Sequence, residues 1–169
     1  MPIKRYMRED AVDYAHYWAY LRNPDFFNFT GFGGDCTNFV SQCLLAGGAV
    51  MNYTPTYGWY YVSSDDRAPA WSGVEYLYNF LTGDFDIGPF GRQVELRNIE
   101  IGDIVQMIFA NEEESPVFEH TAIVVSTGKI PTTENTLVAA HSNDCDCRRL
   151  NTYNIKTLRC IHIDGIRVE

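Results

Sequence analysis

The chain has 169 residues, 46% of them apolar and 21% charged, a composition typical of one globular domain, here spanning residues 1–169. Its net charge of −9 argues against nucleic acid and anionic membranes as partners, because no lysine and arginine cluster offsets it. No run approaches the roughly 18 apolar residues of a membrane span, and the first residues lack a signal-peptide core. We therefore expect a soluble chain without an integral membrane segment. A signal removed from its start would imply an extracellular or cell-envelope location, and the oligomeric state stays open.

The first half of the chain is predicted to be helical. Residues 9–22 carry apolar side chains at helical spacing, and an Asn-Pro pair ends the run. A second helix is predicted to begin at residue 36 and to end at the glycines 47–48, where glycine favours a helix end. Residues 51–71 contain proline and turn residues without a clear period, so we expect an ordered surface loop there. The third predicted helix spans residues 72–81.

The second half is predicted to form strands. Its short β-rich runs are IGDIVQMIF, HTAIVVS, TLVAAHS and LRCIHI. Helices followed by strands indicate an α+β fold with an antiparallel sheet. HTAIVVS and TLVAAHS are expected to pair as a hairpin through STGKIPTTEN. The acidic run at residues 112–114 is expected to be a solvated loop.

Cys36 lies at the start of the second predicted helix, within GFGGDCTNFVSQCLLAGG. Asp35 before it is a favoured N-cap residue type. Cys36, Val40 and Cys43 share one helix face, and a thiol on an apolar face is most often a small hydrophobic residue. The alternative is a nucleophile at a helix N-terminus, where the carboxylate of Asp35 would oppose a thiolate unless it turned back to cap the helix. The local pattern alone favours the structural interpretation.

Histidines are the natural partners of Cys36 in thiol chemistry, because a free thiol is only about 3% ionised at neutral pH. His120 begins the strand HTAIVVS, so its ring can project from the end of a sheet. His141 ends the next strand, and the predicted hairpin would bring the two imidazoles together. His16, within the first helix, and His162, on the last strand, are expected to be structural. The backbone N–H of Cys36 could also donate to a developing oxyanion.

A series of motifs resembles the bacterial putative amidase domain family, in the papain-like group with NlpC-type and CHAP cell-wall hydrolases. They are GDCTNFVSQCLLAGG, GWYY, AWSGVEYLYNFLT, IGDIVQM, HTAIVV and AAHSND, and they cover nearly the whole chain. The resemblance implies a papain-like cysteine hydrolase fold that cleaves amides of the peptidoglycan class without a cofactor. It makes Cys36 the nucleophile and His120 the general base and acid. His141 is the third member by the NlpC pattern, and Asn143 or Asp144 by the CHAP pattern.

Three observations would test this assignment. The start of the Cys36 helix should face the strand end that carries His120, with the sulfur within about 8 Å of its ring. His141 should form a hydrogen bond with the His120 ring and so fix its tautomer. Iodoacetamide at about pH 6 should label Cys36 ahead of the other four cysteines, because a thiolate reacts faster than a thiol.

Other interpretations stay open at this point. Trp59 and Tyr60, in GWYY, could form an aromatic wall of a substrate groove or simply pack over the sheet. The fold could also serve as a non-catalytic module that binds cell-wall ligands. Finally, CDC and CIH supply three cysteines and a histidine, namely Cys145, Cys147, Cys160 and His162. Their one-residue spacing makes a poor zinc chelate and a strained disulfide, so we expect incidental thiols and no metal.

Overall fold

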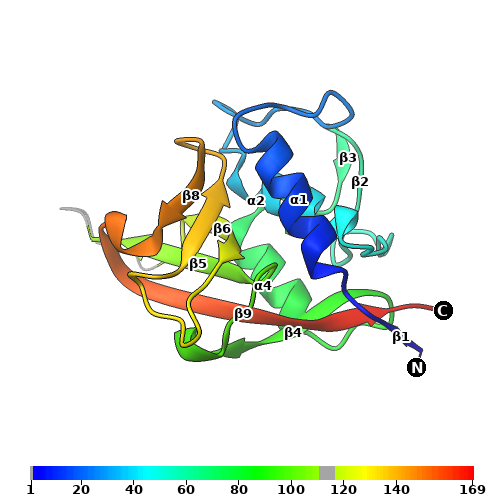
Figure 1. Ribbon diagram of the computed structural model, residues 1–169. Coiled ribbons are helices and arrows are strands. Elements are labelled where there is room, and N and C mark those ends of the chain that lie inside the picture. The colour runs from blue at the N-terminus through cyan, green and yellow to red at the C-terminus, as the bar shows by residue number, and fades with distance from the viewer. Residues whose placement is uncertain (1, 111–116) are drawn as a thin grey trace.

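An antiparallel sheet and a small group of helices make up the fold in this computed structural model, which describes residues 2–110 and 117–169 (Figure 1). The structure is therefore α+β, as the sequence predicted. The acidic run at 112–114 lies outside the described residues. None of the described helices is long and apolar enough to cross a membrane.

The elements follow one another in the order helices first, then strands, with a few exceptions. The helices are α1 (Arg8–Trp18), α2 (Cys36–Ala46), α3 (Pro69–Ser72) and α4 (Val74–Thr82), with 3₁₀ turns at Leu96–Asn98 and Leu150–Thr152. The strands are β1 (Ile3–Lys4), β2 (Tyr61–Ser63), β3 (Asp66–Arg67), β4 (Gly88–Val94), β5 (Ile104–Phe109), β6 (His120–Ser126), β7 (Leu137–Ala140), β8 (Cys145–Arg149) and β9 (Ile155–Arg167).

The main sheet has the strand order β1-β9-β5-β6-β7-β8, and β4 also pairs with β9. Every pairing in it is antiparallel. The longest strand, β9, crosses the whole molecule and pairs with β1, β4 and β5 (Figure 1). The expected hairpin between β6 and β7 is confirmed. β2 and β3 form a separate two-stranded sheet.

The predicted helices are confirmed with changed boundaries. α2 matches the prediction closely, and its first nine residues are buried. α1 ends at residue 18 rather than 22. The third predicted helix is divided into α3 and α4, because Gly73 between them has an extended backbone with φ −111° and ψ 131°. Strand β8 was missed because its sequence, CDCRR, alternates polar residues with cysteines rather than with large apolar side chains.

The segment 51–71 is not the expected surface loop. It contains the β2–β3 hairpin, and the side chains of Trp59 and Trp71 within it are fully buried. The indole N–H of Trp59 donates to the hydroxyl of Ser41 at 3.0 Å, and that of Trp71 donates to the side-chain oxygen of Asn38 at 2.9 Å. The two tryptophans therefore fix this segment to α2, since a buried indole needs an acceptor for its N–H.

The two faces of the sheet belong to two apolar clusters. One cluster packs α1, α2 and α4 against residues such as Ile123 and Ile161. The other cluster lies on the opposite face and includes Met107 and Val124. Successive residues of a strand point to opposite faces, so odd-numbered positions of β6 face the helices and even-numbered positions face away. This alternation decides where each histidine of the predicted site points.

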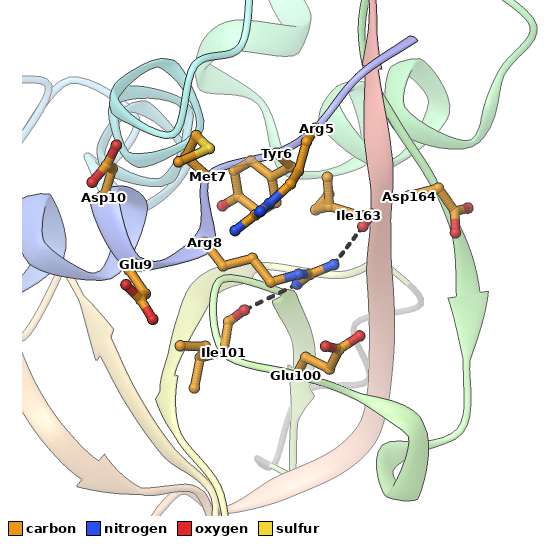
Figure 2. Close-up of a pocket in the computed structure, with 10 residues that line it drawn as sticks. All are labelled: Arg5, Tyr6, Met7, Arg8, Glu9, Asp10, Glu100, Ile101, Ile163 and Asp164. Carbon is orange, nitrogen blue, oxygen red and sulfur yellow. Dashed lines mark hydrogen bonds between the residues drawn. The ribbon is translucent and has the colours of Figure 1, made fainter.

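The N-terminal end of α1 is anchored to the sheet beside a polar hollow (Figure 2). Arg8 donates to the backbone carbonyls of Ile101 at 2.9 Å and Ile163 at 2.5 Å, and it pairs with the buried carboxylate of Asp103 at 2.6 Å. Asp103 also accepts from the ring of His162 at 2.9 Å. These groups satisfy one another, so this end of the molecule is organised for stability.

Candidate functional site

Cys36 is the first residue of α2, and only 7% of it is exposed. The chain reaches it through Gly33 and Gly34, both at φ +99°, a left-handed conformation that glycine adopts readily. Burial raises the pKa of the Cys36 thiol. Hydrogen bonds from Thr121 and Thr37 oppose this rise, whereas the charge of Asp35 adds to it. The net result is a thiol that is protonated at neutral pH.

Asp35 precedes α2 but does not cap it with its side chain. Its carboxylate is fully buried and accepts from the backbone N–H of Phe29 at 2.8 Å, the amide of Asn38 at 2.9 Å and Nδ1 of His141 at 2.5 Å. Burial alone would raise the pKa of Asp35, but these hydrogen bonds outweigh it and keep the pKa below its usual value. The carboxylate therefore organises the loop before Cys36 rather than the free N–H groups of the helix.

His141 lies on the helix-facing side of the sheet. Its ring stacks on Phe39 of α2, with centroids 4.0 Å apart. Its Nε2 atom lies 2.9 Å from the carbonyl oxygen of Trp18 and 3.1 Å from the guanidinium of Arg22, while Nδ1 binds the carboxylate described above. Both ring nitrogens are thus occupied, and the expected hydrogen bond to His120 is not formed. The β6–β7 register explains this, because it places position 141 opposite position 121, one residue out of step with His120.

His120 is the first residue of β6 and is buried. It is paired with Met107 across the sheet, and its ring packs between Phe109 and Tyr153, each with centroids 5.7 Å away. Its Nε2 atom is buried and has no hydrogen-bond partner among the described residues. Burial, together with the nearby charge of Arg148, lowers the pKa of His120 to about 4. The ring is therefore neutral at pH 7 and has one nitrogen unused.

His120 is one of the residues that line a hollow at this end of the sheet. The residues around it include Phe109, Glu119, His120, Ser142, Asn143, Arg148 and Tyr153. Ser142 and Asn143 have left-handed backbones, at φ +66° and +62°, which is uncommon for residues other than glycine. The hydroxyl of Ser142 accepts a long hydrogen bond, 3.4 Å, from the backbone N–H of Asp35. The hollow therefore borders the loop that leads into Cys36.

The start of α2 faces the start of β6. The hydroxyls of Thr37 and Thr121 lie 2.9 Å apart, and each directly follows one of the two predicted catalytic residues, Cys36 and His120. Within the described residues, however, no hydrogen bond joins the Cys36 sulfur to His120 or His141. The sulfur contacts the hydroxyl of Thr37 at 3.8 Å instead. The structure thus brings together the two elements that carry the predicted pair without joining the two side chains.

The two alternative third residues differ in their surroundings. Asn143 lines the same hollow as His120. The carboxylate of Asp144 is bound by the guanidinium of Arg22, with both oxygens 3.0 Å from its nitrogens. Of the three candidates for the third residue, only Asn143 lines the hollow together with His120. His141 is bound to Asp35, and Asp144 is bound to Arg22.

Comparison with known proteins decides the family. The sequence family described as "Putative amidase domain" matches residues 5–163. The chain belongs to this family. It is also 31% identical over 126 residues to the uncharacterized protein YhbB of Bacillus subtilis (strain 168). That alignment covers 74% of the chain and 39% of the relative, so the chain spans about two fifths of that protein's length. No solved structure matches the chain.

The aromatic pair predicted to wall a groove lies away from the hollow of this amidase-family domain. Trp59 is fully buried between Trp71 and Phe80, with centroids 4.8 and 6.4 Å away. Its side chain therefore belongs to the core, which is the packing interpretation. Tyr60 is partly exposed and lies 5.6 Å from the ring of Tyr53. Neither Trp59 nor Tyr60 lines the hollow beside His120.

The cysteines and histidine weighed as a zinc set do not converge. All five thiols of the amidase-family domain are free. Cys145 lies 3.3 Å from a tyrosine hydroxyl, and Cys160 is buried in the second apolar cluster. His162 binds the buried carboxylate at the other end of the sheet, and Cys147 is exposed. Sequence reasoning missed a different group, in which His16 of α1 meets Asp146 of β8 at 2.8 Å. No sequence motif predicts this contact, because 130 residues separate His16 from Asp146.

The order of alkylation is expected to follow exposure in this domain. Cys147 is exposed, whereas Cys36 is 7% exposed and its pKa is raised by burial. Iodoacetamide at neutral pH should therefore label Cys147 first and Cys36 later, with the fully buried Cys43 last. Peptide mass spectrometry over a time course measures the three rates. If Cys36 is labelled first, even at about pH 6, its thiol is activated in the free protein, as the family resemblance implied.

Proposed function

We propose that this protein hydrolyses amide bonds through a thioester on Cys36, on a papain-like fold related to the NlpC-type and CHAP hydrolases. The observation that carries the proposal is the buried, unpartnered Nε2 atom of the neutral His120 ring, a residue that lines a hollow bordering the loop before α2. Buried polar atoms without partners are rare in folded proteins and cost free energy. A neutral imidazole with a free nitrogen is suited to accept a proton. We propose that residues 1–169 act as a single domain in this reaction.

The reaction begins from a neutral pair in this proposal. The thiol of Cys36 is protonated and the ring of His120 is neutral, so the proton moves from Sγ to Nε2 as sulfur attacks the carbonyl carbon. The tetrahedral oxyanion accepts a hydrogen bond from the N–H of Cys36 at the helix N-terminus. His120 then protonates the leaving amine as the C–N bond breaks. Water, deprotonated by His120, cleaves the thioester, which releases the acid and restores the thiol.

Substrate binding has to complete the pair. His120 packs on the face away from α2, and no hydrogen bond links it to Cys36 in the free protein. Catalytic hydrogen bonds are often long in free enzymes and tighten when substrate is bound. We propose that an occupant of the hollow displaces the ring of His120 toward the start of α2. His120 is suited to such a movement because it lies at the end of its strand.

The third position is divided between two residues in this proposal. Asn143 lines the hollow with His120 and is the polar residue suited to orient its ring. His141 acts as a positioning residue, because it binds the Asp35 carboxylate and so holds the loop before Cys36. The sequence analysis gave the orienting role to His141 by the NlpC pattern, with Asn143 or Asp144 as the alternatives, and did not predict the bond to Asp35.

We propose peptidoglycan peptide or amide bonds as the substrate class, on the resemblance to cell-wall hydrolases. Glu119 and Arg148 place both signs of charge at the hollow, which suits a peptide that carries carboxylates and amines. The net charge of −9 does not suit nucleic acid as a substrate. Purified peptidoglycan fragments and simple peptide amides, assayed side by side, test the substrate class separately from the chemistry.

The pH dependence of the rate should report His120. Its pKa is lowered to about 4, so the ring accepts a proton throughout the range above that value and loses this ability as the pH falls through it. We expect kcat/KM to stay high at pH 5 and to halve near pH 4. The measurement is a kcat/KM profile with circular dichroism at each pH, which separates protonation from unfolding. A kcat/KM that halves near pH 6.5, the ordinary pKa of histidine, would mean that a solvent-exposed histidine acts as the general base.

A further inference from the structure

A second group of reactive side chains lies outside the proposed catalytic site. It consists of His16 near the end of α1 and of Asp146 and Cys147 on β8. One ligand atom from each residue lies within 4.8 Å of the other two. Nδ1 of His16 is 2.9 Å from Oδ1 and 2.8 Å from Oδ2 of Asp146, and the sulfur of Cys147 is 3.7 Å from Oδ1. Among the described residues, this is the one set of three that meets such ligand spacing.

We propose that His16, Asp146 and Cys147 bind a divalent cation of the zinc class, with water at the fourth position. Zinc binds imidazole nitrogen, carboxylate oxygen and thiolate sulfur, at about 2.0–2.3 Å from each atom. Magnesium and calcium prefer oxygen ligands alone, so the set disfavours them. Ligands at those lengths in a tetrahedron lie about 3.2–3.8 Å apart. The observed separations are close to this range, so small side-chain movements would admit the ion.

The surroundings suit an accessible site with a fixed centre. His16 and Cys147 are exposed, which leaves a path for the ion and room for water, whereas the side chain of Asp146 is only 18% exposed. The backbone N–H of Asp146 donates to the hydroxyl of Tyr20 at 3.1 Å, so a second contact from the α1 side holds this residue. Uptake of a divalent cation with loss of the Cys147 thiol proton would also make the net charge of −9 less negative by one unit, since the ion adds two positive charges and the proton removes one.

A bound ion would join α1 to β8, two elements that flank the proposed catalytic site. Beyond the end of α1, Arg22 pairs with Asp144, immediately before β8. Arg148, on β8 itself, lines the hollow beside His120. The ion would therefore restrain the strand that supplies one wall of that hollow. Binding itself, however, rests on its three ligands and does not depend on the proposed hydrolysis.

The test is a zinc titration of the metal-free full chain against a chromophoric chelator. We expect one zinc ion per chain, and a loss of affinity of about tenfold or more in each of His16→Gln and Cys147→Ser, a scale that even outer partners of a metal reach. Cys145→Ser is the matched control, because this thiol is on the same strand but outside the group. Unchanged affinity in the His16→Gln/Cys147→Ser double variant, or no stoichiometric binding by the parent, would overturn the proposal.

Two further readouts identify the ligands directly. Cobalt in place of zinc should give a sulfur-to-metal charge-transfer absorption in the parent and in Cys145→Ser, and none in Cys147→Ser. Zinc should also slow the alkylation of Cys147 in the parent without protecting it in His16→Gln. Protection that persists in His16→Gln would place the ion elsewhere and count against the three-residue site.

Discussion

Replacing Cys36 by alanine is expected to abolish amide hydrolysis, with kcat lower by about a thousandfold or more. The reason is that the thioester cannot form without the sulfur, and residues that act as a unit lose nearly all their effect when one is removed. His120→Ala should produce a loss of similar size, because the protonated thiol of Cys36 needs a base. The measurement is single-turnover kinetics on peptidoglycan fragments and on peptide amides.

Cys43→Ala is the matched control for this experiment. Cys43 lies on the same helix and is fully buried, so its loss should reduce the free energy of unfolding but leave kcat near that of the parent. Near-normal turnover in Cys36→Ala would show that Cys36 is a core thiol. If the parent binds peptidoglycan fragments but cleaves none, the domain is the non-catalytic module that the sequence left open.

Asp35→Ala is expected to reduce the free energy of unfolding by about 3 kcal/mol, the scale for removing one partner of a buried charged network. The carboxylate of Asp35 is fully buried and accepts from the N–H of Phe29, from Asn38 and from His141. Its removal leaves these three donors without their acceptor. Urea unfolding followed by circular dichroism measures the change. The exposed Asp25, changed to alanine as a control, should alter the value by no more than about 0.5 kcal/mol.

The carboxylate of Asp35 should make the free energy of unfolding depend on pH in the acidic range. The pKa of Asp35 is lower in the folded protein than its ordinary value of 3.8. A lowered pKa contributes stability that is fully present above the unfolded value and is lost as the pH falls through the folded one. The difference in stability between the parent and Asp35→Asn should therefore be constant from pH 7 to about 5 and narrow below 3.8. A difference that stays constant down to pH 2 would mean that the charge of Asp35 contributes nothing.

The sequence predicts the helices and strands of this fold better than it predicts which way their side chains point. The periodic apolar residues of α2 and the β-branched run of β6 identify both elements, because each pattern has one dominant period. The hairpin of β6 and β7 follows from their turn. The sequence left the burial of Trp59 as one of two open interpretations, because the indole reaches its acceptor on Ser41, a residue 18 positions away.

The sequence predicted that the start of α2 faces the start of β6, but it did not predict the side-chain contacts there. The motifs correctly bring the start of α2 to the start of β6, as the contact between Thr37 and Thr121 shows. The opposite facing of His120 and His141 depends on strand register, and a shift of one residue would exchange their faces. Composition and spacing do not determine that register. The role of Asp35 as a buried acceptor was likewise hidden, since the same residue type usually caps a helix.

The central position of β9 has a consequence for folding during synthesis on the ribosome. This strand pairs with β1, β4 and β5, yet it follows all three of them along the chain and is synthesised after them. Until β9 emerges, the edges of β1, β4 and β5 that pair with it lack their hydrogen-bond partners. Unpaired strand edges promote association with other chains. Contacts between such distant parts of a chain also form slowly. We therefore expect the sheet to be completed only when β9 joins these strands, and a nascent chain that stalls before that point to be exposed to aggregation.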